Sequence, residues 1–154
     1  MKKPILIIDI SKQANHLKQK FMVPISFKEI TRRISIVELP ETDLVIGIGT
    51  GGIVPAALTA YRLGVELRVM TLNYRDENNQ PRHESPVVLQ LPEDPELSGK
   101  KILLVDDVSV SGKTLDAARE LLKGLEVKTL TMKGKADYVL FPEVKDCVKW
   151  PWKP

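Results

Sequence analysis

The chain has 154 residues, enough to bury the core of one domain without metals or disulfides. Hydrophobic residues make up 43% and charged residues 28%, as in an ordinary globular domain, and the longest apolar runs are too short to span a membrane. The net charge is +3, the single cysteine excludes an internal disulfide, and the two histidines leave few ligands for a transition metal.

The amino-terminal part of the chain is basic. Residues 1–33 carry eight basic residues against Asp9 and Glu29. Such a run is usually a solvated surface, although it also suits nucleic acid or a neighbouring subunit. Few aromatic rings lie between these charges, so no nucleic-acid partner is expected. Asp9 also interrupts the apolar run that a secretory signal would need, which predicts a cytoplasmic protein with no membrane partner.

Helical and strand patterns alternate along the chain. Ser26 and Glu29 have capping-box spacing ahead of apolar residues at helical intervals, and the run Ile102–Val105 is typical of a strand buried on both faces. In order, the predicted elements are a helix over 27–39, a strand over 44–46, a helix ending before Gly64, strands over 65–72, 86–91 and 101–105, a helix over 114–123, and strands over 126–132 and 136–141. This alternation predicts an α/β fold with a mostly parallel sheet, whose ligands bind at the carboxyl ends of the strands.

Two glycine-rich turns follow predicted strands. Gly47, Gly49 and Gly52 satisfy the dinucleotide pattern GxGxxG, but the next strand ends in Leu72-Asn73, without the acid that would hold a ribose. Tight packing alone is one explanation of this turn, and an anion held by backbone N–H groups is the explanation we favour. Residues 111–114 resemble the end of a Walker A loop, but Asp107 stands where the first glycine would have to be.

Asp106 and Asp107 follow the buried strand, where two adjacent acids can converge on one ligand. Their carboxylates are acceptors for two ribose hydroxyls or a hydrated magnesium ion. Hydroxyl, backbone and ammonium donors follow over 109–114 at the start of a helix. The sequence therefore predicts a site for a sugar that carries a phosphate.

The stretch Ile102–Leu115 resembles the phosphoribosyl-pyrophosphate (PRPP) signature of type I phosphoribosyltransferases. Gly49–Ala56 resembles the pyrophosphate loop of the purine members, especially the xanthine-guanine and hypoxanthine-guanine branch. The resemblance covers residues 25–152 and implies a mostly parallel central sheet flanked by helices, with a small hood from the chain ends. We expect one domain over 1–154, with a basic segment over 1–24, a core over 25–135 and a hood over 136–154.

The resemblance implies an Mg-dependent glycosyltransferase that moves the 5-phosphoribosyl group from PRPP to a nucleobase, with release of pyrophosphate. The base it implies is a 6-oxopurine (guanine, xanthine or hypoxanthine), as in purine salvage. Asp106 and Asp107 would be the catalytic acids and would hold magnesium together with PRPP. The other implied PRPP-binding residues are Gly49, Thr50, Gly51, Gly52, Arg75, Ser109, Val110, Ser111, Gly112, Lys113 and Thr114.

Lys133, Val148 and Trp150 are the implied base-binding residues, with Lys133 on the oxygen at C6 of the purine. The polar loop over 73–84, which contains Arg75 and Arg82, is the implied lid. We also expect a homodimer or a homotetramer.

Three positions depart from the purine enzymes. Val110 stands where an aspartate usually handles the ring-nitrogen proton, and Thr50 stands where arginine or lysine is common. The stacking position of the hood falls on Cys147 or Val148, which leaves Trp150 as the nearest ring. The alternative is therefore a PRPP- or nucleotide-binding regulatory protein with little turnover. Cys147 has no histidine partner in view and is not expected to be a nucleophile.

Overall fold

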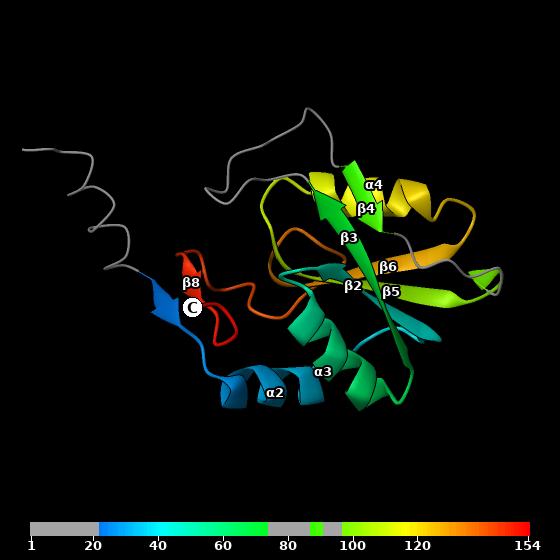
Figure 1. Ribbon diagram of the computed structural model, residues 1–154. Coiled ribbons are helices and arrows are strands. Elements are labelled where there is room, and N and C mark those ends of the chain that lie inside the picture. Colours follow the sequence, from blue (N-terminus) through cyan, green and yellow to red (C-terminus); the bar gives the residue numbers. More distant parts are fainter. Residues whose placement is uncertain (1–21, 74–86, 91–96) are drawn as a thin grey trace, which may run out of the picture.

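The computed structural model describes residues 22–73, 87–90 and 97–154 (Figure 1). Within these ranges, one sheet has the strand order β4-β3-β2-β5-β6-β7, and β1 pairs with β8 in a second, small sheet. The elements are β1 (Val23–Pro24), α2 (Phe27–Ile36), β2 (Leu44–Gly49), α3 (Ile53–Leu63), β3 (Glu66–Asn73), β4 (Val87–Gln90), β5 (Lys101–Ser109), α4 (Lys113–Leu121), β6 (Glu126–Gly134), β7 (Tyr138–Val139) and β8 (Val148–Lys149).

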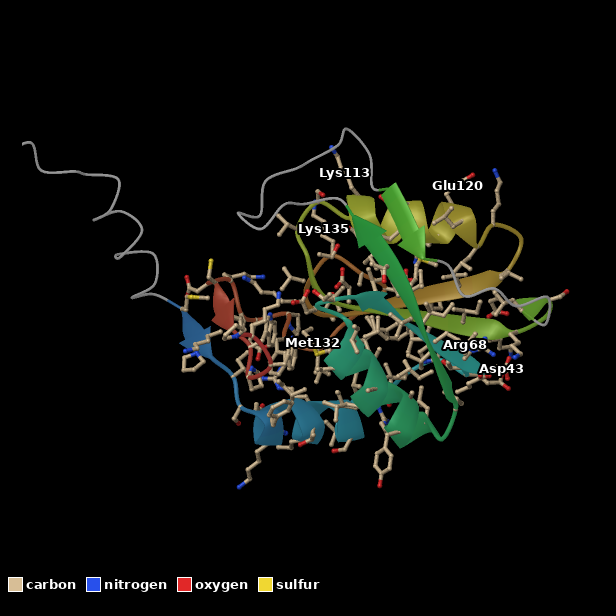
Figure 2. The ribbon with its side chains drawn as sticks, in the orientation of Figure 1. Asp43, Arg68, Lys113, Glu120, Met132 and Lys135 are labelled. Atoms are coloured by element: carbon tan, nitrogen blue, oxygen red, sulfur yellow. The ribbon has the colours of Figure 1, made fainter. Side chains whose placement is uncertain are left out.

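The main sheet is parallel except for β4, which runs antiparallel to β3. Helices α2 and α3 cover one face and α4 covers the other (Figure 1). Alternate residues of each central strand point to opposite faces, so Val45 packs in the core on the α2–α3 side while Ile46 packs under α4. In Figure 2, Met132 of β6 lies on the α3 side of the sheet and Lys113 lies at the start of α4. The predicted α/β fold is confirmed.

Helix α2 is shorter than predicted. It begins after Ser26, whose side chain accepts a hydrogen bond from the Glu29 N–H, as the capping box requires. It ends at Ile36 instead of residue 39, because Val37 is already extended. Val37 and Leu39 pack against the core from this extended segment, and proline at position 40 disfavours a helical residue before it.

Strand β5 is longer than predicted, and this corrects the placement of the two acids. Its pairing with β2 stops at Val105, as expected, but its pairing with β6 continues through Asp106 to Ser109. Asp106 and Asp107 therefore lie within a strand and not after its end. They lie just beyond Val105, the last residue of β5 that pairs with β2.

Two segments from near the two ends of the described chain pair in the hood region. Val23 of β1 pairs with Val148 of β8, and in Figure 1 the two short strands lie beside each other next to the sheet. Arg33 of α2 connects the hood to the core, because it contacts Glu143, donates to the Leu140 carbonyl oxygen at 3.0 Å and covers the Phe141 ring. Among the described residues, no helix is long and apolar enough to cross a membrane.

Candidate functional site

Two loops meet at the carboxyl ends of β2 and β5. The two strands are parallel neighbours, and Gly47 lies opposite Val105. The residues that follow Gly47 and those that follow Val105 therefore lie side by side. A Cβ atom at Gly51 would lie 2.6 Å from the Oδ1 atom of Asp107. The glycine turn and the acid pair are therefore in direct contact, and Gly51 is required because that carboxylate occupies the space of a side chain.

A cavity of about 580 Å³ opens at this junction. Its lining includes most of the residues that the sequence assigns to PRPP and the base: Gly49, Thr50, Gly51, Asp106, Asp107, Ser109, Val110, Ser111, Gly112, Thr114, Lys133, Val148 and Trp150. Gly52 and Lys113 are not part of the lining. Arg75, Arg82 and the predicted lid lie outside the described residues, apart from the backbone of Asn73.

The acid pair is buried and shaped by its own backbone. Asp106 is 8% exposed and Asp107 is 6% exposed. Asp106 Oδ1 accepts from the Asp107 N–H, and Asp107 Oδ1 accepts from the Val108 N–H, both at 2.8 Å. These bonds turn both carboxylates toward the following residues, although successive strand side chains otherwise point to opposite faces. Both acids consequently line one cavity.

Burial, together with the nearby charge of Asp107, raises the pKa of Asp106 to about 8. The pKa of Asp106 is higher in the folded than in the unfolded protein, so the folded protein holds an extra proton between roughly pH 4 and 8. The free energy of unfolding therefore falls as the pH rises through that range.

We therefore expect the free energy of unfolding to fall by up to about 1.4 kcal/mol per pH unit between pH 5 and 8. Asp106→Asn should flatten this dependence, because the amide does not titrate. Urea denaturation at several pH values measures both slopes. Asp116→Asn, on the exposed side of α4, is the control and should keep the wild-type slope. Equal slopes in the wild type and Asp106→Asn would contradict the raised pKa.

The glycine turn is explained in large part by packing. A Cβ atom at Gly52 would lie 2.4 Å from the Val105 carbonyl oxygen, so this turn presses against β5. The Gly52 N–H donates to the Ile48 carbonyl and the Ile53 N–H to the Thr50 carbonyl. Within the described residues, the N–H groups of Thr50 and Gly51 have no such bond and are the ones left for an anion. Packing thus accounts for more of this turn than the sequence argument allows.

The second loop joins β5 to α4. Ser109 is buried and its hydroxyl has no partner among the described residues, whereas Val110 is 70% exposed. The Lys113 N–H is 3.4 Å from Ser111 Oγ, and α4 begins at Lys113. The exposed amide and hydroxyl groups of this loop, at a helix start that faces the cavity, are suited to a phosphate.

Lys133 joins the cavity to the hood. Its ammonium donates to the backbone carbonyls of Lys145 (3.0 Å) and Asp146. An ammonium has three donors, so one remains for a ligand. Trp150 also lines the cavity, but it is 2% exposed and stacked on Trp152, with ring centroids 5.3 Å apart. The base-binding roles of Lys133, Val148 and Trp150 stay predictions.

Lys153 is a site residue that the sequence argument missed. Its Nζ atom is 2.5 Å from Asp107 Oδ2, and it lines the same cavity. Nothing in the local pattern marks it, because it lies 46 positions from its partner in a short segment without periodicity. Cys147 also lines the cavity and is an exposed, free thiol.

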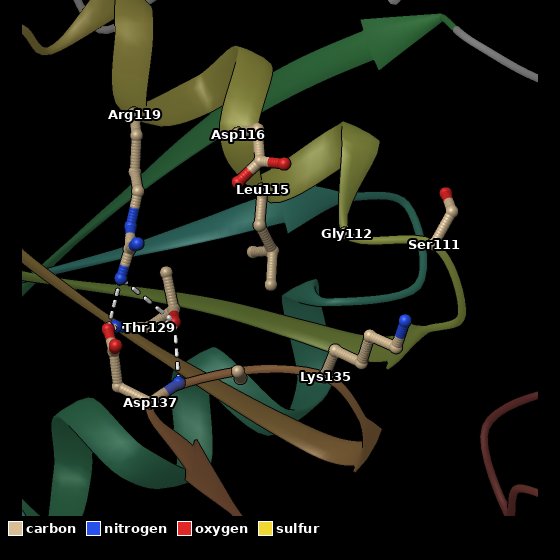
Figure 3. A pocket seen from close by; sticks show the side chains of 9 residues that line it. Ser111, Gly112, Leu115, Asp116, Arg119, Thr129, Lys135 and Asp137 are labelled. Atoms are coloured by element: carbon tan, nitrogen blue, oxygen red, sulfur yellow. Dashed lines mark hydrogen bonds and ion pairs between the residues drawn. The ribbon is translucent and has the colours of Figure 1, made fainter.

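A smaller cavity of about 220 Å³ lies behind the second loop (Figure 3). Asp137 accepts from the N–H and hydroxyl of Thr129, and it pairs with Arg119 of α4. Burial raises the pKa of Asp137, but these hydrogen bonds outweigh burial and hold it below the usual range. The network joins α4 to β6 and so fixes the helix whose start faces the larger cavity.

The acid pair offers oxygen donors that a hard divalent cation such as magnesium prefers. The described residues contain no group of three or more His, Cys, Asp or Glu side chains that could hold a metal. Asp107 Oδ2 is buried and accepts no hydrogen bond, although the Lys153 ammonium contacts it. Asp106 and Asp107, with this buried Oδ2 oxygen that accepts no hydrogen bond, fit a magnesium ion. The other ligands of the ion would come from a bound phosphate compound or from water.

Comparison with known proteins agrees with this geometry. A family model described as "Phosphoribosyl transferase domain" matches residues 18–150. A xanthine-guanine phosphoribosyltransferase of Chromohalobacter salexigens is 32% identical over 122 residues, which cover 75% of this chain and 72% of that protein. An orotate phosphoribosyltransferase of Sulfurisphaera tokodaii is 31% identical over 93 residues, which cover 60% of this chain and 43% of that protein.

The crystal structure of a purine phosphoribosyltransferase from Pyrococcus horikoshii Ot3 is similar to this fold. The TM-score is 0.67 at 25% identity, and the match covers 86% of this chain and 95% of that one. The chain spans about half the length of several curated relatives that it matches. The relatives' printed names include both purine and orotate enzymes, so they do not agree on one base.

Proposed function

The chain belongs to the phosphoribosyl transferase domain family, and from that membership we propose that it transfers the 5-phosphoribosyl group of PRPP to a nucleobase and releases pyrophosphate. The observation that carries the proposal is the contact between Gly51 and Asp107 within one cavity. This contact brings donors for a pyrophosphate beside acceptors for a ribose, and a phosphate loop follows at the start of α4.

The chemistry needs binding and charge more than a nucleophile. Displacement at the anomeric carbon develops positive charge on the sugar, which the negative charge of the buried acid pair can stabilise. The N–H groups of Thr50 and Gly51 would hold the departing pyrophosphate, and residues 110–114 would hold the 5′-phosphate. Holding both partners at fixed positions supplies much of the rate by proximity.

Asp106 and Asp107 would hold magnesium together with PRPP. When bound, the ion would neutralise charge on the pyrophosphate that leaves. Asp107 Oδ2, a buried oxygen that attracts the Lys153 ammonium, supports this assignment, because it already contacts a cation. The homodimer or homotetramer expected from the sequence stays a prediction.

We propose a 6-oxopurine as the accepting base. The remaining donor of the Lys133 ammonium suits an exocyclic oxygen, and an ammonium cannot accept a hydrogen bond from an amino group. A xanthine-guanine enzyme is among the relatives. Val110 offers no carboxylate to the ring nitrogen, so proton transfer there has to go to another group or to water.

The test is kcat/KM for guanine, xanthine, hypoxanthine, adenine and orotate with PRPP and magnesium. We expect a preference of at least ~10-fold for the 6-oxopurines, the value of one good hydrogen bond to a charged group. Lys133→Met should reduce that preference, and Lys135→Met is the control, because Lys135 lines the smaller cavity. Better turnover of adenine by the wild type would show that the role given to Lys133 is wrong, and better turnover of orotate would show that the base is not a 6-oxopurine.

A further inference from the structure

The acid pair of the free protein already has a cation beside it. Lys153 Nζ lies 2.5 Å from Asp107 Oδ2, where the lysine side chain is 51% exposed and the aspartate side chain 9% exposed. The partner oxygen is therefore buried while the ammonium is reached from solvent. A divalent ion that bound to Oδ2 would meet this ammonium, because both are cations that approach the same oxygen.

A block of aromatic rings fixes the backbone that carries Lys153. Trp150 and Trp152 are stacked at an interplanar angle of 4°, and Phe141 packs on Trp150 with ring centroids 6.1 Å apart. Phe27 of α2 contacts Trp152, and the Lys153 N–H donates to the Trp150 carbonyl at 3.1 Å. The backbone of Lys153 is thus held by packed aromatic residues. Only the flexible lysine side chain would have to move for the ammonium to leave Asp107.

Lys153 is distinguished from the other charged residues of the cavity by its contact with the acid pair. Among the described residues that line the cavity, the charged ones are Asp106, Asp107, Lys133 and Lys153. Lys133 is held by two hood carbonyls, so its ammonium is directed to the hood. In the described part of the chain, Lys153 is the cation that pairs with the acids.

We propose that Lys153 is a tethered counter-ion that competes with a divalent cation for Asp107 and gives way when a phosphorylated substrate enters. The ammonium then moves from the carboxylate to the substrate's phosphate oxygens, which are the new anions in the cavity. Metal binding thereby becomes dependent on substrate. The substrate half of this proposal rests on the proposed function, whereas the competition with the metal does not.

The experiment titrates Mn²⁺ into the protein without PRPP and follows free Mn²⁺ by electron paramagnetic resonance. Lys153→Gln removes the ammonium and should tighten Mn²⁺ binding by about tenfold, whereas Lys153→Arg should stay close to the wild type. Lys149→Gln is the matched control, because Lys149 is an exposed lysine of β8 outside the cavity lining. Adding Asp107→Asn to Lys153→Gln should abolish the gain.

Mn²⁺ binding by Lys153→Gln that is no tighter than that of the wild type would overturn the competition. A second titration, of PRPP in the presence of Mg²⁺, should give an affinity severalfold weaker for Lys153→Gln than for the wild type. Unchanged PRPP affinity would overturn the transfer of the ammonium to phosphate. If the wild type binds no PRPP at all, the proposed function fails, and the Mn²⁺ titration still decides the competition on its own.

Discussion

Asp107→Asn is expected to lower kcat/KM for pyrophosphate release from PRPP by at least about 100-fold. Asp107 is buried at the centre of the site, in contact with the glycine turn. A charge-assisted hydrogen bond contributes about 1.5 to 3 kcal/mol. The neutral amide of the variant would form a weaker hydrogen bond to the ribose, and it would lack the negative charge that holds magnesium. An isosteric amide leaves the packing of β5 in place.

The control for this variant is Asp116→Asn, which makes the same chemical change at an exposed residue of α4 that lines only the smaller cavity, and it should keep wild-type turnover. Thermal denaturation of both variants separates loss of the site from loss of the fold. A folded Asp107→Asn protein with turnover within about threefold of the wild type would be incompatible with the ribose and metal roles of this acid, since it corresponds to less than 1 kcal/mol.

Trp150→Ala should lower the free energy of unfolding by about 3–5 kcal/mol, as is usual for a large buried aromatic residue. Trp150 is 2% exposed and packs between Phe141 and Trp152, so its removal opens a cavity where the hood meets the core. Urea denaturation measures the loss.

Tyr61→Ala is the matched control, because Tyr61 is 89% exposed on α3 and should change stability by no more than about 0.5 kcal/mol. The Trp150 substitution should also disturb the position of Lys153, whose backbone N–H donates to the Trp150 carbonyl. A loss below 1 kcal/mol in Trp150→Ala would mean that the aromatic block is not what holds the hood to the core.

The sequence predicts the central sheet well, because its strands are continuous apolar runs and its helices have a single apolar face. Ser26 caps α2 as expected, and Gly64 ends α3 in the left-handed conformation. The two site loops are also predictable, since each follows one of these strands and parallel neighbours bring them together. Local signals suffice for these features.

Other features depend on contacts that no local pattern encodes. The extension of β5 to Ser109 depends on pairing with β6, so the acids lie in a strand although polar residues usually end one. The packing requirement at Gly52 comes from the backbone of β5, far along the chain. The pairing of Val23 with Val148 and the contact of Lys153 with Asp107 likewise join distant segments.

We propose that one cavity binds PRPP through the acid pair and the glycine turn. The deciding experiment is a calorimetric titration of PRPP into the protein with Mg²⁺, beside a titration with ribose 5-phosphate. We expect one PRPP bound per chain, with affinity higher than that of ribose 5-phosphate, because the latter leaves the Thr50 and Gly51 N–H groups without an anion. The absence of PRPP binding, or equal affinity for the two ligands, would contradict it.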